Sequence, residues 1–228
     1  MTRVLAVVHH VDPALSLAQV GTAARAGCDG VVLIQMDGRD AEVDEPAVVA
    51  KRRYPGLLVG ANRLSCEPWE AIARDAELGL DLTWADEPGV TSAGPGSKVV
   101  RIRAALDAAR AANPGFLFFG SVAFKTQRPD PDPAGAAAVA AREPWVVTTS
   151  GKATGSAPEE AKLAAMAGTI GAGRLAVASG ITPANAPRLA PHVGWVLVST
   201  GISRSFTEFD EGLAGDLVAA CREHGYRG

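Results

Sequence analysis

The chain has 228 residues and a net charge of −3, and 47% of its residues are hydrophobic and 21% charged. This is an ordinary composition for a soluble protein that buries a sizeable core. The slight negative charge is opposite to the basic balance of proteins that bind nucleic acid or anionic membranes. No apolar run approaches the roughly 20 residues that cross a bilayer. We therefore expect no nucleic-acid partner and no membrane partner.

The N-terminal sequence and the cysteines indicate in which cellular compartment the protein resides. The opening Met-Thr-Arg-Val-Leu-Ala-Val-Val-His-His is too short and becomes polar too soon for a signal peptide. Cys28, Cys66 and Cys221 are scattered without metal-ligand spacing, and their odd number does not suit a disulfide framework. We expect a cytoplasmic protein with reduced thiols.

Short apolar runs rich in valine and leucine alternate with segments of helical periodicity. Most of the runs are continuous rather than alternating, which is typical of strands buried on both faces of a parallel sheet. The predicted strands are residues 4–8, 30–35, 57–62, 80–85, 116–123, 145–149, 175–178 and 195–199. The predicted helices are residues 13–26, 44–54, 68–78, 98–112, 132–141, 158–170, 183–190 and 208–224.

Eight strand–helix units in this length predict a single (β/α)8 TIM barrel that occupies residues 1–228 as one domain. The structural alternative is an open, doubly wound sheet. Such sheets usually carry a glycine-rich phosphate loop after the first strand. Here the first strand is followed by His9, His10, Val11, Asp12 and Pro13, with no glycine. The sequence therefore favours the closed barrel.

The loops after the last two strands predict a phosphate site, because (β/α)8 barrels often hold phosphate there. Glycine lets the backbone approach an anion closely, and Thr182 is placed to cap the next helix, whose free N–H groups would face the anion. The alternative is that Gly180 and Gly201 only form tight turns between strand and helix and bind no ligand. The predicted phosphate-binding residues are Ser179, Gly180, Ile181, Thr200 and Gly201.

Active sites of such barrels lie at the carboxyl ends of the strands, which selects the candidates for catalysis. They are His9, Asn62, Asp86 and Lys125. Histidine transfers protons near neutral pH, and a rim carboxylate can act as general base. Lys125 can form a Schiff base if desolvation lowers its pKa, or it can bind an anion electrostatically.

Four further residues are candidates for substrate binding. Gln35 follows the second strand, while Thr149, Lys152 and Thr154 belong to a polar glycine loop after the sixth strand. That loop lacks the glycine spacing of a nucleotide P-loop. Its hydroxyls and lysine suit a ribose, a second phosphate or a carboxylate, and a solvated loop is the alternative. No metal site is assigned, although two rim acids such as Asp37 and Asp86 have the oxygen ligands that a divalent cation prefers.

Four segments, in order along nearly the whole chain, resemble the BtpA family of (β/α)8 proteins. They are Gly27-Cys-Asp-Gly-Val-Val-Leu-Ile-Gln-Met-Asp-Gly38, Leu58-Val-Gly-Ala-Asn-Arg63, Thr148-Thr-Ser-Gly-Lys-Ala-Thr-Gly155 and Val177-Ala-Ser-Gly-Ile-Thr-Pro-Ala-Asn185. The family resembles the ribulose-phosphate-binding barrels, so the resemblance implies a phosphorylated ligand. Some members are linked to photosystem I assembly and others to sugar-utilisation operons. This chain has Gln35-Met36 where the family tends to carry Glu-Asn.

The functional expectation is a soluble metabolic enzyme that binds a phosphorylated sugar or a phosphoribosyl compound and performs lyase, isomerase or glycosyl-bond chemistry. Two alternatives stay open. The same loops can hold the phosphate of FMN, or the barrel can serve as a non-enzymatic assembly or regulatory factor. The outer helices are a plausible surface for a homo-oligomer. No cofactor is assigned beyond the two options of FMN and a divalent cation.

Overall fold

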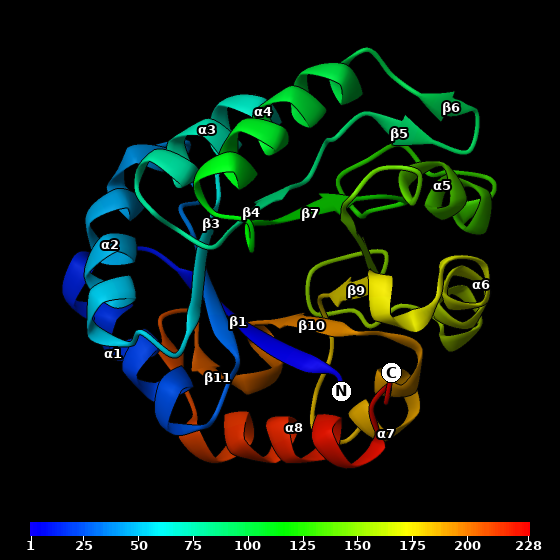
Figure 1. Cartoon of the computed structure of the whole chain (residues 1–228). Coiled ribbons are helices and arrows are strands. Elements are labelled where there is room, and N and C mark those ends of the chain that lie inside the picture. Colours follow the sequence, from blue (N-terminus) through cyan, green and yellow to red (C-terminus); the bar gives the residue numbers. More distant parts are fainter.

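A computed structural model describes all residues from 1 to 228, and its centre is a closed barrel of parallel strands (Figure 1). Strand β1 pairs with β2 on one side and with β10 on the other, and this pairing closes the ring. The prediction of a barrel is confirmed, and the open sheet is excluded. In ring order the strands are β1 (Arg3–His9), β2 (Gly30–Ile34), β3 (Leu58–Asn62), β4 (Leu82–Ala85), β7 (Leu117–Ser121), β8 (Val146–Ser150), β9 (Leu175–Ala178) and β10 (Trp195–Val198).

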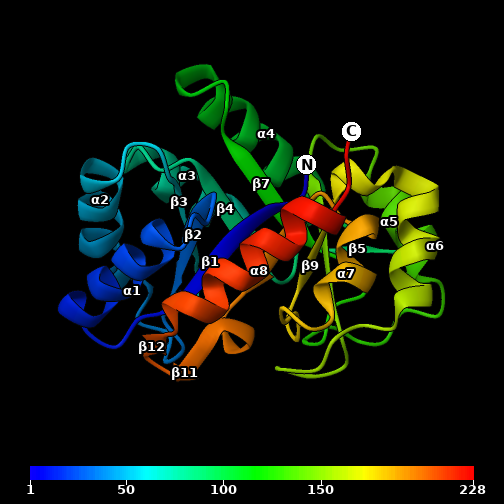
Figure 2. The ribbon, with the colours of Figure 1, turned by 90° about the horizontal axis from the view of Figure 1, so that it is seen from below.

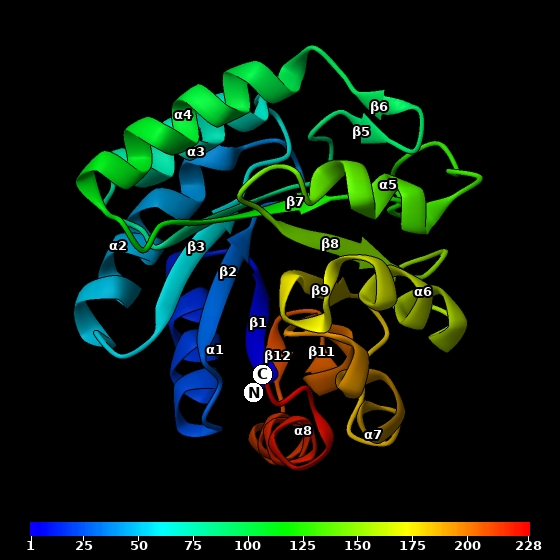
Figure 3. The ribbon, with the colours of Figure 1, turned by 45° about the vertical axis from the view of Figure 1, so that its right-hand side comes forward.

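Helices surround the barrel on all sides (Figures 1 and 3). They are α1 (Pro13–Arg25), α2 (Asp44–Arg53), α3 (Pro68–Glu77), α4 (Lys98–Ala112), α5 (Pro133–Ala140), α6 (Glu160–Ile170), α7 (Ala186–Leu189) and α8 (Glu211–His224). Side-chain caps mark the N-termini of several of these helices. The side chain of Asp12, for example, accepts a hydrogen bond from the Leu15 amide, with Pro13 at the first helical position. None of the helices is long and apolar enough to cross a bilayer.

The last third of the chain departs from the predicted element bounds. Residues 183–190 were predicted as a helix, but α7 spans only Ala186–Leu189. Asn185 and Thr182 explain the difference, because each side chain accepts the other's backbone N–H and holds a turn ahead of the helix. The start of α8 was also predicted too early. Residues before it form a small hairpin of β11 (Ser203–Ser205) and β12 (Glu208–Phe209).

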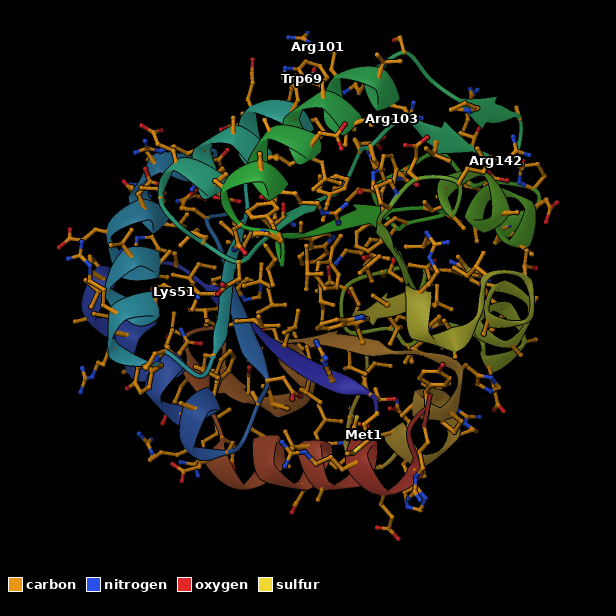
Figure 4. The ribbon with its side chains drawn as sticks, in the orientation of Figure 1. Met1, Lys51, Trp69, Arg101, Arg103 and Arg142 are labelled. Atoms are coloured by element: carbon orange, nitrogen blue, oxygen red, sulfur yellow. The ribbon has the colours of Figure 1, made fainter.

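A second small hairpin, β5 (Val90–Thr91) with β6 (Gly94–Pro95), follows β4. Side chains fill the space inside the barrel (Figure 4), and 12 buried hydrophobic residues form this inner core. Phe119 and Trp195 meet edge to face there, with ring centroids 5.2 Å apart. A larger cluster of 47 residues lies between the strands and the helices. The interior of the barrel is therefore a packed core that leaves no room for a ligand.

The two ends of the barrel differ (Figure 2). Both termini lie at one end, while the β11–β12 hairpin and the loop between β8 and α6 lie at the other. That second end carries the carboxyl ends of the strands. Outside the strands, side-chain pairs join neighbouring elements: Lys51 of α2 lies 2.5 Å from Asp81 ahead of β4, and Arg101 of α4 stacks 3.8 Å over the Trp69 ring of α3 (Figure 4).

Candidate active site

The alternation of β1 decides which of two adjacent histidines faces the barrel mouth. Leu5 and Val7 belong to the inner core, so His9, two residues further on, also faces inward. His10 faces the helices, where its Nδ1 lies 2.9 Å from the hydroxyl of Ser16. Only His9 is therefore placed to meet a ligand in the mouth.

His9 is enclosed by the last loops of the chain. Its ring stacks on that of Phe206, with centroids 4.4 Å apart and planes 3° from parallel, and its Nδ1 lies 3.4 Å from Ser199 Oγ. Burial lowers the pKa of His9, the positive charge of Lys125 lowers it further, and a backbone hydrogen bond at Phe206 opposes them. The imidazole is consequently neutral at neutral pH and can accept a proton.

Asn62 and Asp86 form a polar pair at the ends of β3 and β4. Asn62 Nδ2 donates to Asp86 Oδ1 over 3.1 Å. Burial raises the pKa of Asp86, while hydrogen bonds from Asn62 and Thr126 and the charge of Lys125 act against this. Asn62 is 1% exposed, and its Oδ1 has no hydrogen-bond partner. A buried acceptor without a partner costs free energy, so this oxygen is available to a ligand that brings a donor.

Lys125 comes from the loop after β7 and contacts the loops after the neighbouring strands β8 and β9. Its Nζ donates to Thr154 Oγ1 at 3.0 Å and to Ser179 Oγ at 3.1 Å. Burial lowers the pKa of Lys125, and the charge of Asp86 opposes that effect. Both hydrogen-bond partners are neutral hydroxyls, so the lysine keeps a positive charge that no contacting carboxylate neutralises. Such a cation attracts an anionic ligand or a developing negative charge.

The two glycine turns predicted to hold phosphate lie side by side. A Cβ on Gly201 would collide with the carbonyl oxygen of Ile181, so the turn after β10 packs directly on the turn after β9. Ser179 and Gly180 both have positive φ, 73° and 69°. The backbone N–H groups of Gly180 and Ile181 donate to no acceptor in the protein. Uncommitted amides in a turn are suited to binding an anion.

The loop between β8 and α6 packs on these turns, and Gly180 and Ile181 are buried. A Cβ on Gly180 would collide with the backbone of Ser156 and Ala157, and Gly155 lies beside the hydroxyl of Thr200. Three consecutive loops therefore pack against one another at one side of the mouth. This contact brings Thr154 to Lys125, as described above.

Three predicted substrate-binding residues lie away from the mouth. Gln35 is 2% exposed and accepts the amides of Asp37 and Arg39, so it organises its own loop. Thr149 faces the helices, because Thr148 and Ser150 take the inward positions of β8, and its hydroxyl donates to the Ala123 carbonyl. The Lys152 side chain is 91% exposed and lies 3.5 Å from Glu159.

Two pockets flank the mouth. One of about 350 Å³ lies between the loops after β3 and β4 and is bordered by Asp86, Glu87 and Lys98. The other, of about 620 Å³, lies outside β7 and β8 and is bordered by Lys125 and Lys162. Neither is lined by Gly180 or Gly201. No group of three or more His, Cys, Asp or Glu side chains is arranged to hold a metal ion.

Two further side chains at this end of the barrel were not among the predicted candidates. Phe206 lies in the loop ahead of the last predicted helix, and only the hairpin brings its ring over His9. Lys162 lies within the predicted helix 158–170. Its position in the first turn of α6, where a cation opposes the helix dipole, is a signal that the sequence does contain.

Taken together, the fold and the mouth define a (β/α)8 barrel with polar and charged side chains converging at the carboxyl ends of its strands. The chain is similar over 97% of its length to a structure described as native KDPGal, at 16% identity, with 95% of that chain covered and a TM-score of 0.69. Phosphoribosyl anthranilate isomerase from Thermus thermophilus has 16% identity, coverage of 97% and 99%, and a TM-score of 0.67. A 3-hexulose-6-phosphate synthase has 15% identity, coverage of 96% and 99%, and a TM-score of 0.69.

These similarities show the fold, a (β/α)8 barrel. No protein-family model and no curated protein sequence matches the chain. The resemblance to the BtpA family therefore stays a prediction, whereas the barrel fold that it implied is confirmed.

Proposed function

We propose that this protein is an enzyme that acts on a phosphorylated sugar or a phosphoribosyl compound at the carboxyl end of the barrel. The observation that carries the proposal is the convergence at one mouth of two adjoining glycine turns and of the group Asn62, Asp86 and Lys125. In the first of these turns the amides of Gly180 and Ile181 have no acceptor. The turns supply a place for a phosphate, and the side chains supply groups that transfer protons and stabilise charge.

The phosphate lies against the amides of Gly180, Ile181, Thr200 and Gly201. Backbone N–H groups in turns bind anions because several donors point to one place without a side-chain entropy cost. Lys125 stands next to this place, since its Nζ contacts the hydroxyl of Ser179. Its charge adds a long-range attraction for the phosphate. A ligand held at its phosphate end is oriented for reaction at its other end.

The reacting end lies toward His9, Asn62 and Asp86. Asp86, whose pKa burial raises, is suited to giving and taking a proton. The free Oδ1 of Asn62 accepts a hydrogen bond from a ligand hydroxyl or amine, and its Nδ2 keeps the Asp86 carboxyl oriented. Lys125 stabilises negative charge that develops on the ligand. These roles fit isomerase, lyase or glycosyl-bond chemistry, all of which begin with a proton transfer to or from a sugar carbon or oxygen.

The solved structures support the same class of substrate. Two of the similar proteins are, by name, an isomerase of phosphoribosyl anthranilate and a synthase of a hexulose 6-phosphate. The convergence of Asn62, Asp86 and Lys125 favours an enzyme over an assembly factor, because a factor without catalysis has no need to keep these groups together. The FMN alternative has a direct test, since a flavin-binding protein is yellow and a colourless protein that takes up no added flavin excludes it.

Calorimetric titration with ribose 5-phosphate tests the proposal. We expect binding that inorganic phosphate competes away. The variant Lys125→Gln should bind about 10–100-fold more weakly, which corresponds to the loss of a hydrogen bond to a charged group. Lys152→Gln is the matched control, because its side chain is 91% exposed, and it should bind like the wild type. Equal affinity of Lys125→Gln and the wild type would contradict the proposal.

A further inference from the structure

The pocket of about 350 Å³ between the loops after β3 and β4 lies beside the proposed reacting end of the ligand. Asp86 belongs to both places, because it borders this pocket and also accepts the hydrogen bond of Asn62 at the mouth. The glycine turns that are proposed to hold the phosphate do not border the pocket. A ligand that is bound at its phosphate and reaches Asp86 therefore has this space at its far end.

Carboxylates outnumber cations around this pocket. The charged residues that line it are four acids and two bases, namely Glu67, Glu70, Asp86, Glu87, Arg63 and Lys98. The charge of Arg63 is offset by Asp75 at 2.7 Å and Asp44 at 2.8 Å, neither of which lines the pocket. Lys98 lies 2.7 Å from Glu67. The pocket is therefore left with an excess of negative charge.

Asp86 and Glu87 are carboxylates that no cation contacts. Lys98, the cation whose charge acts on Glu87, is bound to Glu67 instead. Lys125 acts on Asp86 through its charge only, because its Nζ donates to two hydroxyls. Asp86 is half-buried and Glu87 is exposed, so the acidic wall of the pocket runs from the mouth out to solvent.

A buried amide next to Asp86 is an independent indication of the same kind of ligand. Asn62 is 1% exposed, and its Oδ1 has no hydrogen-bond partner. Its Nδ2 donates to Asp86 Oδ1 over 3.1 Å, so the Oδ1 of the same amide group lies close to the Asp86 carboxyl. All the unpaired polar groups at this place are acceptors. A buried acceptor without a donor costs free energy, which a ligand with several N–H donors recovers.

We propose that this pocket receives a protonated amino group of the substrate, which is therefore a sugar phosphate that carries an amine rather than a neutral sugar phosphate. This assignment rests on the proposed function, because it names the far end of the same ligand. An ammonium group brings a positive charge and three N–H donors. These donors match the Oδ1 of Asn62 and the carboxylates of Asp86 and Glu87. Hydrogen bonds between charged groups are the strong ones, so the amino group selects the substrate.

Calorimetric titration with a matched pair of sugar phosphates tests the proposal. Glucosamine 6-phosphate and glucose 6-phosphate differ in one group, an amine in place of a hydroxyl, and the amine is mostly protonated at pH 7. We expect glucosamine 6-phosphate to bind about 10–100-fold more tightly, as for a hydrogen bond to a charged group. Both titrations contain EDTA, so that no divalent cation takes the place of the amine.

Two variants locate the preference for the amine. In Glu87→Gln the preference should fall by about 3–5-fold, while the affinity for glucose 6-phosphate is unchanged. Glu223→Gln removes the same charge from an exposed position on α8 and should keep the full preference.

Each outcome of these titrations decides the question. Equal affinities of the wild type for the two ligands, or a preference that Glu87→Gln leaves intact, would overturn the proposal while the proposed function stands. If neither sugar phosphate binds, the proposed function fails and the amine pocket fails with it.

Discussion

The charge of Lys125 affects the pKa values of two other side chains at the mouth, His9 and Asp86. Burial is the main cause of the lowered pKa of His9, and the positive charge of Lys125 lowers it further. The same charge opposes the rise in the pKa of Asp86 that burial causes. The ammonium of Lys125 is itself bound by hydroxyls only. The Lys125 cation therefore favours the neutral imidazole of His9, which can accept a proton, and the charged carboxylate of Asp86.

Replacing Lys125 by methionine should raise the pKa of both His9 and Asp86. The imidazolium no longer meets a neighbouring cation, and the carboxylate no longer has one to stabilise it. NMR titration of the His9 Cε1–H and the Asp86 carboxyl carbon measures both shifts. Lys152→Met, at an exposed position, should move neither. A fall in either pKa, or no change in both, would show that Lys125 does not act on the mouth.

The sequence predicted which residues lie at the mouth, but it did not predict their side-chain contacts. The positions of His9, Asn62, Asp86 and Lys125 at the carboxyl ends of their strands follow from strand order and alternation. The Asn62–Asp86 hydrogen bond and the contacts of Lys125 with the loops after β8 and β9 were not predicted. Thr149 was assigned to the substrate although the same alternation turns it outward. Gln35 depends on a hydrogen-bond pattern within its loop, which no periodicity reveals.

Glycine turns connect the last three strands of the barrel to its outer layer. Gly201 is required by contact, since a side chain there would meet the Ile181 carbonyl. The strands and the long helices were predicted to within a few residues, because apolar runs and capping residues mark their ends. The short α7 and the β11–β12 hairpin were not, because local side-chain hydrogen bonds and packing on the mouth decide them.

Two glycine-to-alanine variants should have opposite effects on stability. Gly201→Ala should lower the free energy of unfolding by about 1–3 kcal/mol, because the new methyl group overpacks the two turns. Gly215→Ala, inside α8 with no atom near its Cβ position, should raise it by about 0.5–1 kcal/mol through helix propensity. Urea denaturation measures both. A Gly201→Ala protein as stable as the wild type would mean that the two turns do not adjoin.

A buried ion pair joins α3 to the end of β3. Arg63 lies 2.7 Å from Asp75 and 2.8 Å from Asp44, and its side chain is 3% exposed. Burial raises the pKa of Asp75 to about 6, and Arg63 acts against that rise. Arg63 follows β3 directly, as the residues of the mouth do, but its side chain is buried against α2 and α3. It therefore stabilises the structure that positions its neighbour Asn62.

Arg63→Met should lower the free energy of unfolding by about 3–5 kcal/mol at pH 7.5, because it leaves Asp75 buried without a cation. Arg25→Met, which removes an exposed pair with Glu211, should cost about 1 kcal/mol or less. Asp75 has a folded pKa above its unfolded value, so its charge opposes folding as pH rises through about 6. The deficit of Arg63→Met should accordingly shrink at pH 5. A deficit that grows toward acid pH would contradict this account.

The whole molecule brings together residues that are far apart in the sequence. Closure of β1 on β10 places His9 next to Ser199, 190 positions later, and it sets the loops of β8, β9 and β10 on one side of the mouth. At the other end of the barrel the Arg3 guanidinium lies over the Trp195 ring. Active sites of (β/α)8 barrels lie at the end that carries the carboxyl ends of the strands.

A crystal structure of the protein soaked with ribose 5-phosphate tests the central claim most directly. We predict density for the phosphate within hydrogen-bonding distance of the amides of Gly180, Ile181, Thr200 and Gly201, with the sugar directed toward Asn62 and Asp86. Density for the ligand at another face of the barrel, with none at these two turns, would contradict the claim.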